Sequence, residues 1–194
     1  MAKVLVLYYS SWGHLEAMAK AAAEGAKEAG ATVSIKRVPE LVPVEVAKAA
    51  YYKLDQEAPI ADPLELDQYD GFVLCCSTRY GMMAAQLKNF LDQTGMLWFK
   101  GVLASKVVTA FTSASTAHGG LESTILATLN VAYHWGALVM PLGYGPPAVA
   151  KTGNPYGASF VSRKGSQPDE DALAAARAQG ARLAKVAAAL RAAA

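Results

Sequence analysis

The sequence lacks the features that mark several common classes of protein. It contains neither a G-x-G-x-x-G stretch nor a Walker lysine motif, which argues against a dinucleotide fingerprint and a P-loop NTPase. The net charge is only +2, and the charges are scattered rather than gathered into a basic patch that could bind nucleic acid. Every apolar run is shorter than a membrane span. We therefore expect neither a nucleic-acid partner nor a membrane-spanning segment.

Cysteine is also scarce, with only the adjacent Cys75 and Cys76 inside an apolar run. Neighbouring strand residues point to opposite faces, so these two thiols cannot easily pair, and we expect them to pack in the core. The chain enters a strand at once, without the basic region and cleavage site of a signal peptide, which together with the cysteine usage predicts a cytoplasmic protein. No paired carboxylates, His/Cys cluster or Ser-His-Asp arrangement stands out, so we expect no metal site and no nucleophilic catalysis.

The stretch from residue 4 to residue 18 organises the rest of the chain. Val4 to Leu7 is apolar without alternation, which is typical of a strand buried on both faces of a parallel sheet. Ser10 and Ser11 follow, then Gly13 and a helical pattern. Either serine can accept hydrogen bonds from the first free helix amides, and such amides form an anion site. The alternative is an ordinary capped turn between a strand and a helix.

Five apolar segments alternate with helical patterns, which predicts one α/β domain over residues 1–194 with a doubly wound parallel sheet and helices on both faces. The expected strands are 4–9, 32–38, 71–76, 106–111 and 137–142. The expected helices are 13–29, 84–94, 122–133 and 169–193. An irregular insert is expected at about 40–68, with a helical turn near 44–51, and a long loop at about 143–168. An insert of this length is usually functional or part of an interface.

The first, third and fourth expected strands each end in a hydroxyl-rich loop, at residues 10–15, 77–83 and 112–120. The carboxyl ends of parallel strands meet at one edge of a sheet, where ligands bind at the switch point of strand order. Three such loops predict a site for a phosphorylated ligand that carries a flat ring system.

Six stretches resemble the WrbA family of flavodoxin-like, FMN-dependent NAD(P)H:quinone oxidoreductases. They are MAKVLVLYYS..GH, KRVPE, STRYGMM..QLKNFLDQTG.LW, FTSAS..HGG.E, PLGY and NPYGAS, and they span residues 2–168. The resemblance implies the strand order 2-1-3-4-5 and FMN as cofactor. It also implies a two-electron, ping-pong reduction of a quinone with NAD(P)H as electron donor, in a homotetramer whose flavin pockets are finished by neighbouring subunits.

By this resemblance, the cofactor would contact all three loops. The residues are Ser10, Ser11, Trp12, Gly13, His14 and Leu15; Thr78, Arg79, Tyr80 and Gly81; and Ser113, Ala114, Ser115, Thr116, Ala117, His118 and Gly119. Arg79 and His134 would be catalytic, with His134 also beside the cofactor, and Trp12 and Trp98 would contact the substrate. From the residues alone, His14 favours the surface, Trp98 and His134 fit a core role as well, and His118 stays open.

Some positions depart from the family pattern, namely Trp12, Tyr80, Leu121, Trp135 and the stretch 117–120. They bear on which nicotinamide and which quinone are accepted. Two other functions are compatible with the fold. One is a one-electron carrier of the flavodoxin kind, which the near-neutral charge disfavours, and the other is a non-catalytic interaction protein.

Overall fold

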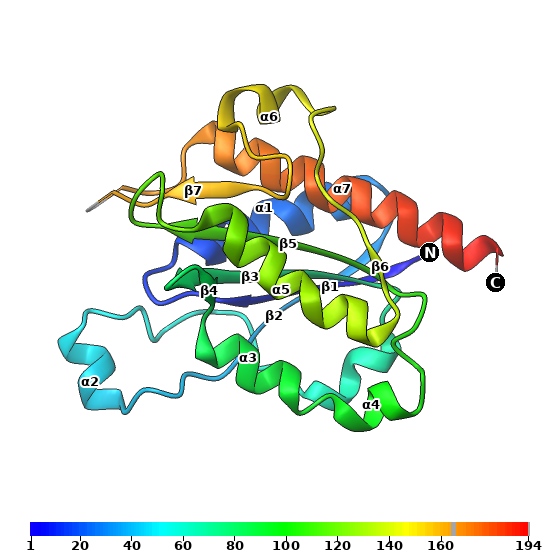
Figure 1. Ribbon diagram of the computed structural model, residues 1–194, viewed down its shortest axis with the longest axis horizontal. Coiled ribbons are helices and arrows are strands. Elements are labelled where there is room, and N and C mark those ends of the chain that lie inside the picture. Colours follow the sequence, from blue (N-terminus) through cyan, green and yellow to red (C-terminus); the bar gives the residue numbers. More distant parts are fainter. Residues whose placement is uncertain (164–165, 194) are drawn as a thin grey trace.

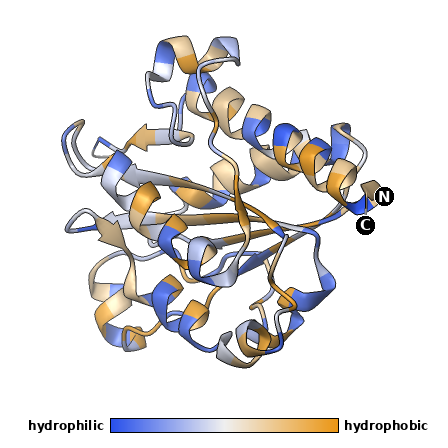
Figure 2. Cartoon of the chain, turned by 45° about the vertical axis from the view of Figure 1, so that its right-hand side comes forward, coloured by the Kyte–Doolittle hydropathy of each residue, from blue (hydrophilic) through white to orange (hydrophobic). Residues whose placement is uncertain are grey.

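The computed structural model describes residues 1–163 and 166–193, and its central feature is a twisted sheet between two layers of helices (Figure 1). Helices α1 (His14–Glu28) and α7 (Glu170–Ala193) cover one face. Helices α3 (Ala85–Asp92), α4 (Gly95–Phe99) and α5 (Leu121–Trp135) cover the other. The central strands are the most hydrophobic part of the chain (Figure 2). No helix in the described residues is long and apolar enough to cross a membrane.

Five parallel strands run in the order β2-β1-β3-β5-β6. They are β1 (Lys3–Tyr9), β2 (Thr32–Arg37), β3 (Gly71–Arg79), β5 (Val107–Ala114) and β6 (Leu138–Val139). This order is the predicted one, but the prediction of a five-stranded sheet is wrong, because the sheet has seven strands within the described residues. The additional strands are β4 (Met82–Met83), antiparallel to β3, and β7 (Ser159–Val161), parallel to β5.

The outer edge of β5 explains this difference. β6 pairs with the beginning of β5, so the strand predicted over 137–142 is shortened to two residues, and the end of β5 pairs instead with β7. Pro141 has no N–H to continue the ladder. The predicted loop 143–168 accordingly contains both α6 (Pro147–Thr152) and β7.

Gln179 of α7 fills the gap between β6 and β7. Its fully buried side chain donates to the Ala110 carbonyl (2.9 Å) and accepts from the Ala158 amide (2.7 Å). Gly157 is required beside it, because a Cβ there would lie 2.1 Å from the Ala110 carbonyl oxygen. The side-chain amide thus satisfies backbone groups that a continuous strand would have paired.

Helices α1 and α7, which cover the same face of the sheet, approach each other through small residues. A Cβ on Gly25 of α1 would lie 2.0 Å from the Arg177 carbonyl oxygen, and one on Gly180 of α7 would lie 1.9 Å from that of Ala22. The alanine-rich composition of α7 therefore reflects close backbone packing. Asp169 caps this helix, accepting from the Ala172 amide at 2.8 Å.

The predicted cysteine arrangement is confirmed. Cys75 packs in the core beneath α1 and α7, whereas Cys76 packs in the core beneath α5, and both are free thiols. The insert is more ordered than predicted, since it contains α2 (Val44–Ala49) and the 3-10 helix η1 (Pro63–Gln68). The segment 96–99, predicted as loop, belongs to α4.

Candidate functional site at the carboxyl edge of the sheet

Loop 1, residues 10–13, connects β1 to α1 on the left in Figure 1. The buried Ser10 Oγ accepts hydrogen bonds from the amides of Gly13 (3.0 Å) and Leu15 (3.2 Å). Gly13 has a φ of 90°, a conformation that glycine adopts without steric cost. Of the two serines considered from the sequence, Ser10 therefore organises the helix start. Ser11 instead donates to the Tyr9 hydroxyl at 3.1 Å.

Loop 2 is a hairpin, not the open loop predicted for residues 77–83. Thr78 and Arg79 still belong to β3 and pair with Met83 and Met82 of β4. The two turn residues, Tyr80 and Gly81, have φ values of 54° and 75°, as in the tight turns that match strand twist. Tyr80 is fully exposed there, in a conformation that is uncommon for a bulky residue.

Arg79 joins loop 2 to loop 1. Its guanidinium donates to Ser11 Oγ (3.1 Å), Ser77 Oγ (3.1 Å) and the Thr78 carbonyl (3.0 Å). The same group lies 5.9 Å from the centre of the Trp12 ring, within the range of a cation–π contact. These contacts hold the cation at the edge where the switch point of the sheet lies.

Loop 3, residues 115–120, follows β5 and contacts loop 2. Ser113 and Ala114, predicted in this loop, are the last residues of β5, whereas Ser115, Thr116, Ala117 and His118 are exposed. A Cβ on Gly120 would lie only 2.7 Å from the Gly81 Cα, so the two loops touch through glycine backbones. Thr124 of α5 adds a hydroxyl contact to Thr78 at 2.7 Å. The three predicted loops are therefore brought together.

The chemistry of these loops fits FMN. None of the stretches 10–15, 78–81 and 113–119 contains a carboxylate, so a dianionic phosphate meets no negative charge within them. Loop 1 leads into the amino end of α1, where free amides favour an anion. Trp12 and Tyr80 keep exposed aromatic surfaces, against which a flat ring can pack.

His14 does not lie on the open surface that its sequence position favoured. It is half-buried, and its ring meets Phe160 of β7 edge-on with 5.6 Å between the ring centres. Burial lowers the pKa of His14 below its ordinary value, against a smaller raising effect of the Ser166 backbone. The shift favours the neutral imidazole.

Trp98 and His134 lie away from loops 1 and 3, in a groove that reaches the last two residues of loop 2. Both line a groove of ≈ 580 Å³ between α3, α4 and α5, together with Met82 and Met83. His134 is in the last turn of α5, about 20 Å along the helix from loop 3. Their predicted contact with the cofactor stays a prediction. Trp135, one of the departures from the family pattern, packs edge-on against Phe72 in the core.

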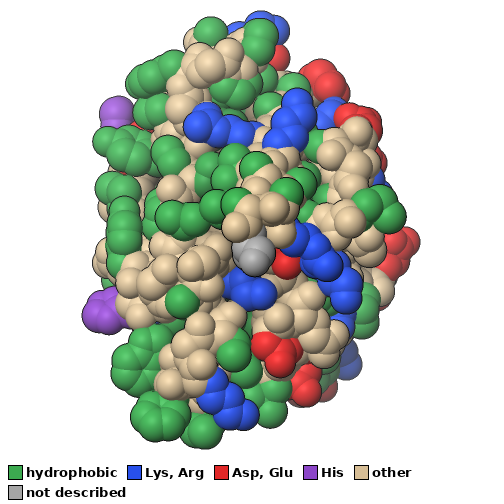
Figure 3. Space-filling model, turned by 90° about the vertical axis from the view of Figure 1, so that its right-hand side faces the viewer, with side chains coloured by type: hydrophobic (Ala, Val, Ile, Leu, Met, Phe, Trp, Pro, Cys, Tyr) green, Lys and Arg blue, Asp and Glu red, His purple; other side chains and the backbone are tan. Residues whose placement is uncertain are grey.

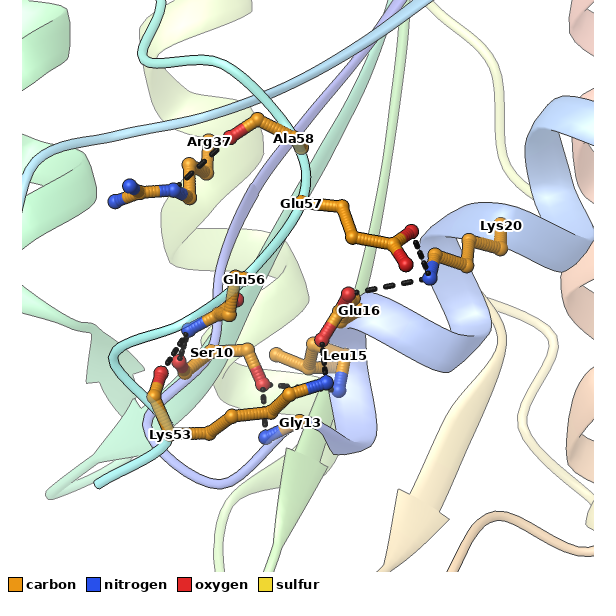
Figure 4. Close-up of polar contacts among 10 residues, drawn as sticks. All are labelled: Ser10, Gly13, Leu15, Glu16, Lys20, Arg37, Lys53, Gln56, Glu57 and Ala58. Carbon is orange, nitrogen blue, oxygen red and sulfur yellow. Dashed lines mark hydrogen bonds and ion pairs between the residues drawn. The ribbon is translucent and has the colours of Figure 1, made fainter.

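Sequence reasoning missed three residues beside loop 1, which Figure 4 shows. Glu16, almost fully buried in the first turn of α1, accepts from Lys53 Nζ at 2.8 Å and forms an ion pair with Lys20. Gln56 donates to the Ser10 carbonyl at 2.7 Å. Lys53 and Gln56 come from the insert, whose unusual length was the available signal.

The Glu16 carboxylate stays charged despite its burial. Burial raises the pKa of Glu16, but the hydrogen bonds from Lys53 and Lys20 outweigh it and lower the pKa overall. The cluster therefore carries its charges in ion pairs beside loop 1 and adds no free carboxylate to the site.

The fold and the three loops define a flavodoxin-like protein. The chain belongs to the NADPH-dependent FMN reductase family, whose family model matches residues 2–146. An NAD(P)H dehydrogenase (quinone) of Rhizobium rhizogenes is 57% identical over 98% of this chain and 99% of its own length. A protein of the same name from Chelativorans sp. is 55% identical over 98% of this chain and 99% of its own length.

Solved structures agree with this assignment. A WrbA-like flavodoxin from Agrobacterium tumefaciens has a TM-score of 0.70 and 26% identity over 97% of this chain and 99% of its own. A flavodoxin from the domain Archaea has a TM-score of 0.61 and 20% identity, covering 96% of this chain and 99% of its own. At this identity the likeness supports the fold alone. The resemblance to the WrbA family is confirmed.

Proposed function

We propose that this protein is an FMN-dependent NAD(P)H:quinone oxidoreductase. The observation that carries the proposal is the joining of three carboxylate-free loops at the switch point of the sheet, through the Arg79–Ser11 hydrogen bond and the Gly81–Gly120 contact. The near full-length similarity to quinone-reducing NAD(P)H dehydrogenases supports the same activity.

The residues of the site have separate tasks in this proposal. Loop 1 would bind the FMN phosphate, Trp12 and Tyr80 would border the ring, and loop 3 would cover its other edge. FMN, when bound, supplies the hydride chemistry. Arg79, held by three hydrogen bonds, would place a positive charge where the ring gains negative charge on reduction.

The proposal has a simple test. The purified protein should be yellow and should oxidise NADH or NADPH when benzoquinone is supplied, with the parallel-line kinetics of a ping-pong scheme. A colourless protein that binds no added FMN would contradict it. A one-electron carrier would instead bind FMN but turn over neither nicotinamide with benzoquinone. A non-catalytic protein would do neither.

The charge distribution favours the enzyme over the carrier. A flavodoxin-type carrier needs a strongly charged docking face, whereas this chain has a net charge of +2. The face at the amino ends of the strands shows basic and acidic side chains side by side (Figure 3). On this face the charges of the described residues are mixed rather than gathered by sign.

We further propose that the working unit is a cytoplasmic homotetramer in which Trp98 and His134 complete the flavin pocket of a neighbouring chain. The groove that they line lies among exposed apolar side chains, with Met96 59%, Trp98 55% and Phe99 77% exposed. Closed association buries such surfaces. Light scattering should report four chains, and a monomer that keeps full activity on dilution would contradict the shared pocket.

A further inference from the structure

The most heavily bonded feature near loop 1 is a segment of the insert, residues 50–58, which we call the strap. Its ends are fixed elsewhere. Glu40, before the strap, accepts from the Tyr9 hydroxyl (2.8 Å) and from Gln86 (2.6 Å), and Arg37 of β2 donates to the Ala58 carbonyl (3.0 Å). Between these anchors the strap crosses the outer side of loop 1 (Figure 4).

The strap binds the backbone of loop 1 at two successive carbonyls. Gln56 Nε2 donates to the Ser10 carbonyl (2.7 Å), and the Lys53 amide donates to the Ser11 carbonyl (2.8 Å). Trp12 is tied to the strap as well, through its indole N–H to the Ala50 carbonyl (3.2 Å) and an edge-on contact with Tyr52.

These bonds decide where the loop amides point. In a trans peptide, the carbonyl of one residue and the N–H of the next point in opposite directions. Because the carbonyls of Ser10 and Ser11 face the strap, the N–H groups of Ser11 and Trp12 face away from it. Within residues 1–163 and 166–193, neither of these two amides donates to a protein acceptor. Two free donors are thus directed by the strap.

The Lys53 side chain fixes the strap against the helix start. Its Cδ lies 3.3 Å from where a Cβ on Gly13 would be, and its ammonium reaches the buried Glu16 carboxylate at 2.8 Å. The aliphatic stem therefore covers the glycine while the charge is anchored to α1.

We propose that the strap positions loop 1 for the phosphate of the cofactor, with Gln56 and Lys53 as positioning residues that direct the Ser11 and Trp12 amides toward it. The proposal rests on the proposed function, because it assigns the phosphate of FMN to loop 1. It adds residues outside the three loops to the binding of that phosphate.

The test compares FMN with riboflavin, which has the same ring but no phosphate, by fluorescence quenching on the apoprotein. Gln56→Ala and Lys53→Met, which keeps the apolar stem, should each weaken FMN binding about tenfold, as expected for a lost hydrogen bond or ion pair. Riboflavin binding should change by less than about twofold, because the ring contacts are intact. Asp55→Asn, an exposed change in the same strap, should alter neither affinity.

A second readout follows from the reciprocity of coupled binding. FMN should slow hydrogen exchange at the Lys53 amide, and riboflavin should not. A thermal melt of each apoprotein variant establishes that it is folded. If Lys53→Met does not fold, Gln56→Ala, at a half-buried position, still tests the proposal.

The outcomes separate this proposal from the proposed function. Wild-type protein that binds neither flavin overturns both. Wild-type protein that binds FMN, with variants that bind it equally well or lose riboflavin to the same extent, overturns only the positioning role of the strap.

Discussion

The three loops and the groove are two parts of one predicted pocket, and they differ in how a single chain holds them. At the loops, the Arg79 guanidinium donates hydrogen bonds to Ser77 of β3 and to Ser11 of loop 1, and Gly120 lies against Gly81. In the groove, Trp98 and His134 are exposed. The difference teaches that one chain holds the loops in place by its own contacts but leaves Trp98 and His134 exposed, which is the surface that the proposed neighbouring chain would cover.

The same substitution should have opposite effects in the two regions. Gly120→Ala should destabilise the protein by about 3–4 kcal/mol and abolish FMN binding, because its φ of 86° and the 2.7 Å approach to Gly81 admit no Cβ. Gly95→Ala, at the first position of α4 with open space around it, should stabilise by up to about 1 kcal/mol. Urea unfolding measures both. Equal changes in the free energy of unfolding for the two variants would contradict the difference between the loops and the groove.

Arg79→Ala should affect the cofactor more than the fold. Removing the guanidinium should lower the two-electron potential of bound FMN and slow its reduction by NAD(P)H about tenfold, because a charge-assisted contact is lost. Spectroelectrochemistry and stopped-flow absorbance measure these effects. Lys100→Ala, which removes an exposed positive charge near the groove, serves as the control. Unchanged values for Arg79→Ala would show that it is only a surface charge.

Trp98→Ala should leave the stability of the isolated chain nearly unchanged, within about 1 kcal/mol, because the side chain is half exposed. It should instead change the kinetic constants for benzoquinone. The neighbouring Leu97 is buried, and Leu97→Ala should cost about 2–3 kcal/mol. A loss of about 3–5 kcal/mol for Trp98→Ala would assign it to the core.

The smallest expected effect is a pH dependence from His14. Its pKa is lowered in the folded protein, so below the unfolded value of about 6.5 the unfolded chain binds more protons. Stability should therefore fall slightly as the pH drops below about 6.5, down to the lowered folded pKa. Melts of the wild type and of His14→Asn between pH 5 and about 8 test this. A wild type that gains stability on acidification relative to the variant would contradict it.

The sequence was a good guide where burial alone decides structure. Apolar runs and, for β2, an alternating pattern identified the parallel strands β1, β2, β3, β5 and β6 but not β7. The hydroxyl-rich stretches identified the loops that meet at the edge. The sequence was a poor guide where a backbone group is hydrogen-bonded by a side chain that lies far away in the sequence. Between β6 and β7, the backbone groups of Ala110 and Ala158 are paired by the side chain of Gln179, which lies beyond both strands in the sequence.

The site shows the same limit. Ser10, Arg79 and the Gly81–Gly120 region follow strand ends, so their convergence is predictable from topology. Lys53 and Gln56 reach loop 1 from the middle of the insert, and no periodicity connects them to it. The hairpin turn at Tyr80 was missed because an aromatic residue rarely adopts a positive φ.

The most direct test of the central claim is a titration of the apoprotein with FMN and with FAD, followed by quenching of flavin fluorescence. Loop 1 is short, contains a single glycine and leads directly into α1, so we expect it to accept one phosphate rather than a pyrophosphate. We predict saturable binding of one FMN per chain and markedly weaker binding of FAD. FAD binding as tight as FMN binding, or tighter, would contradict the account.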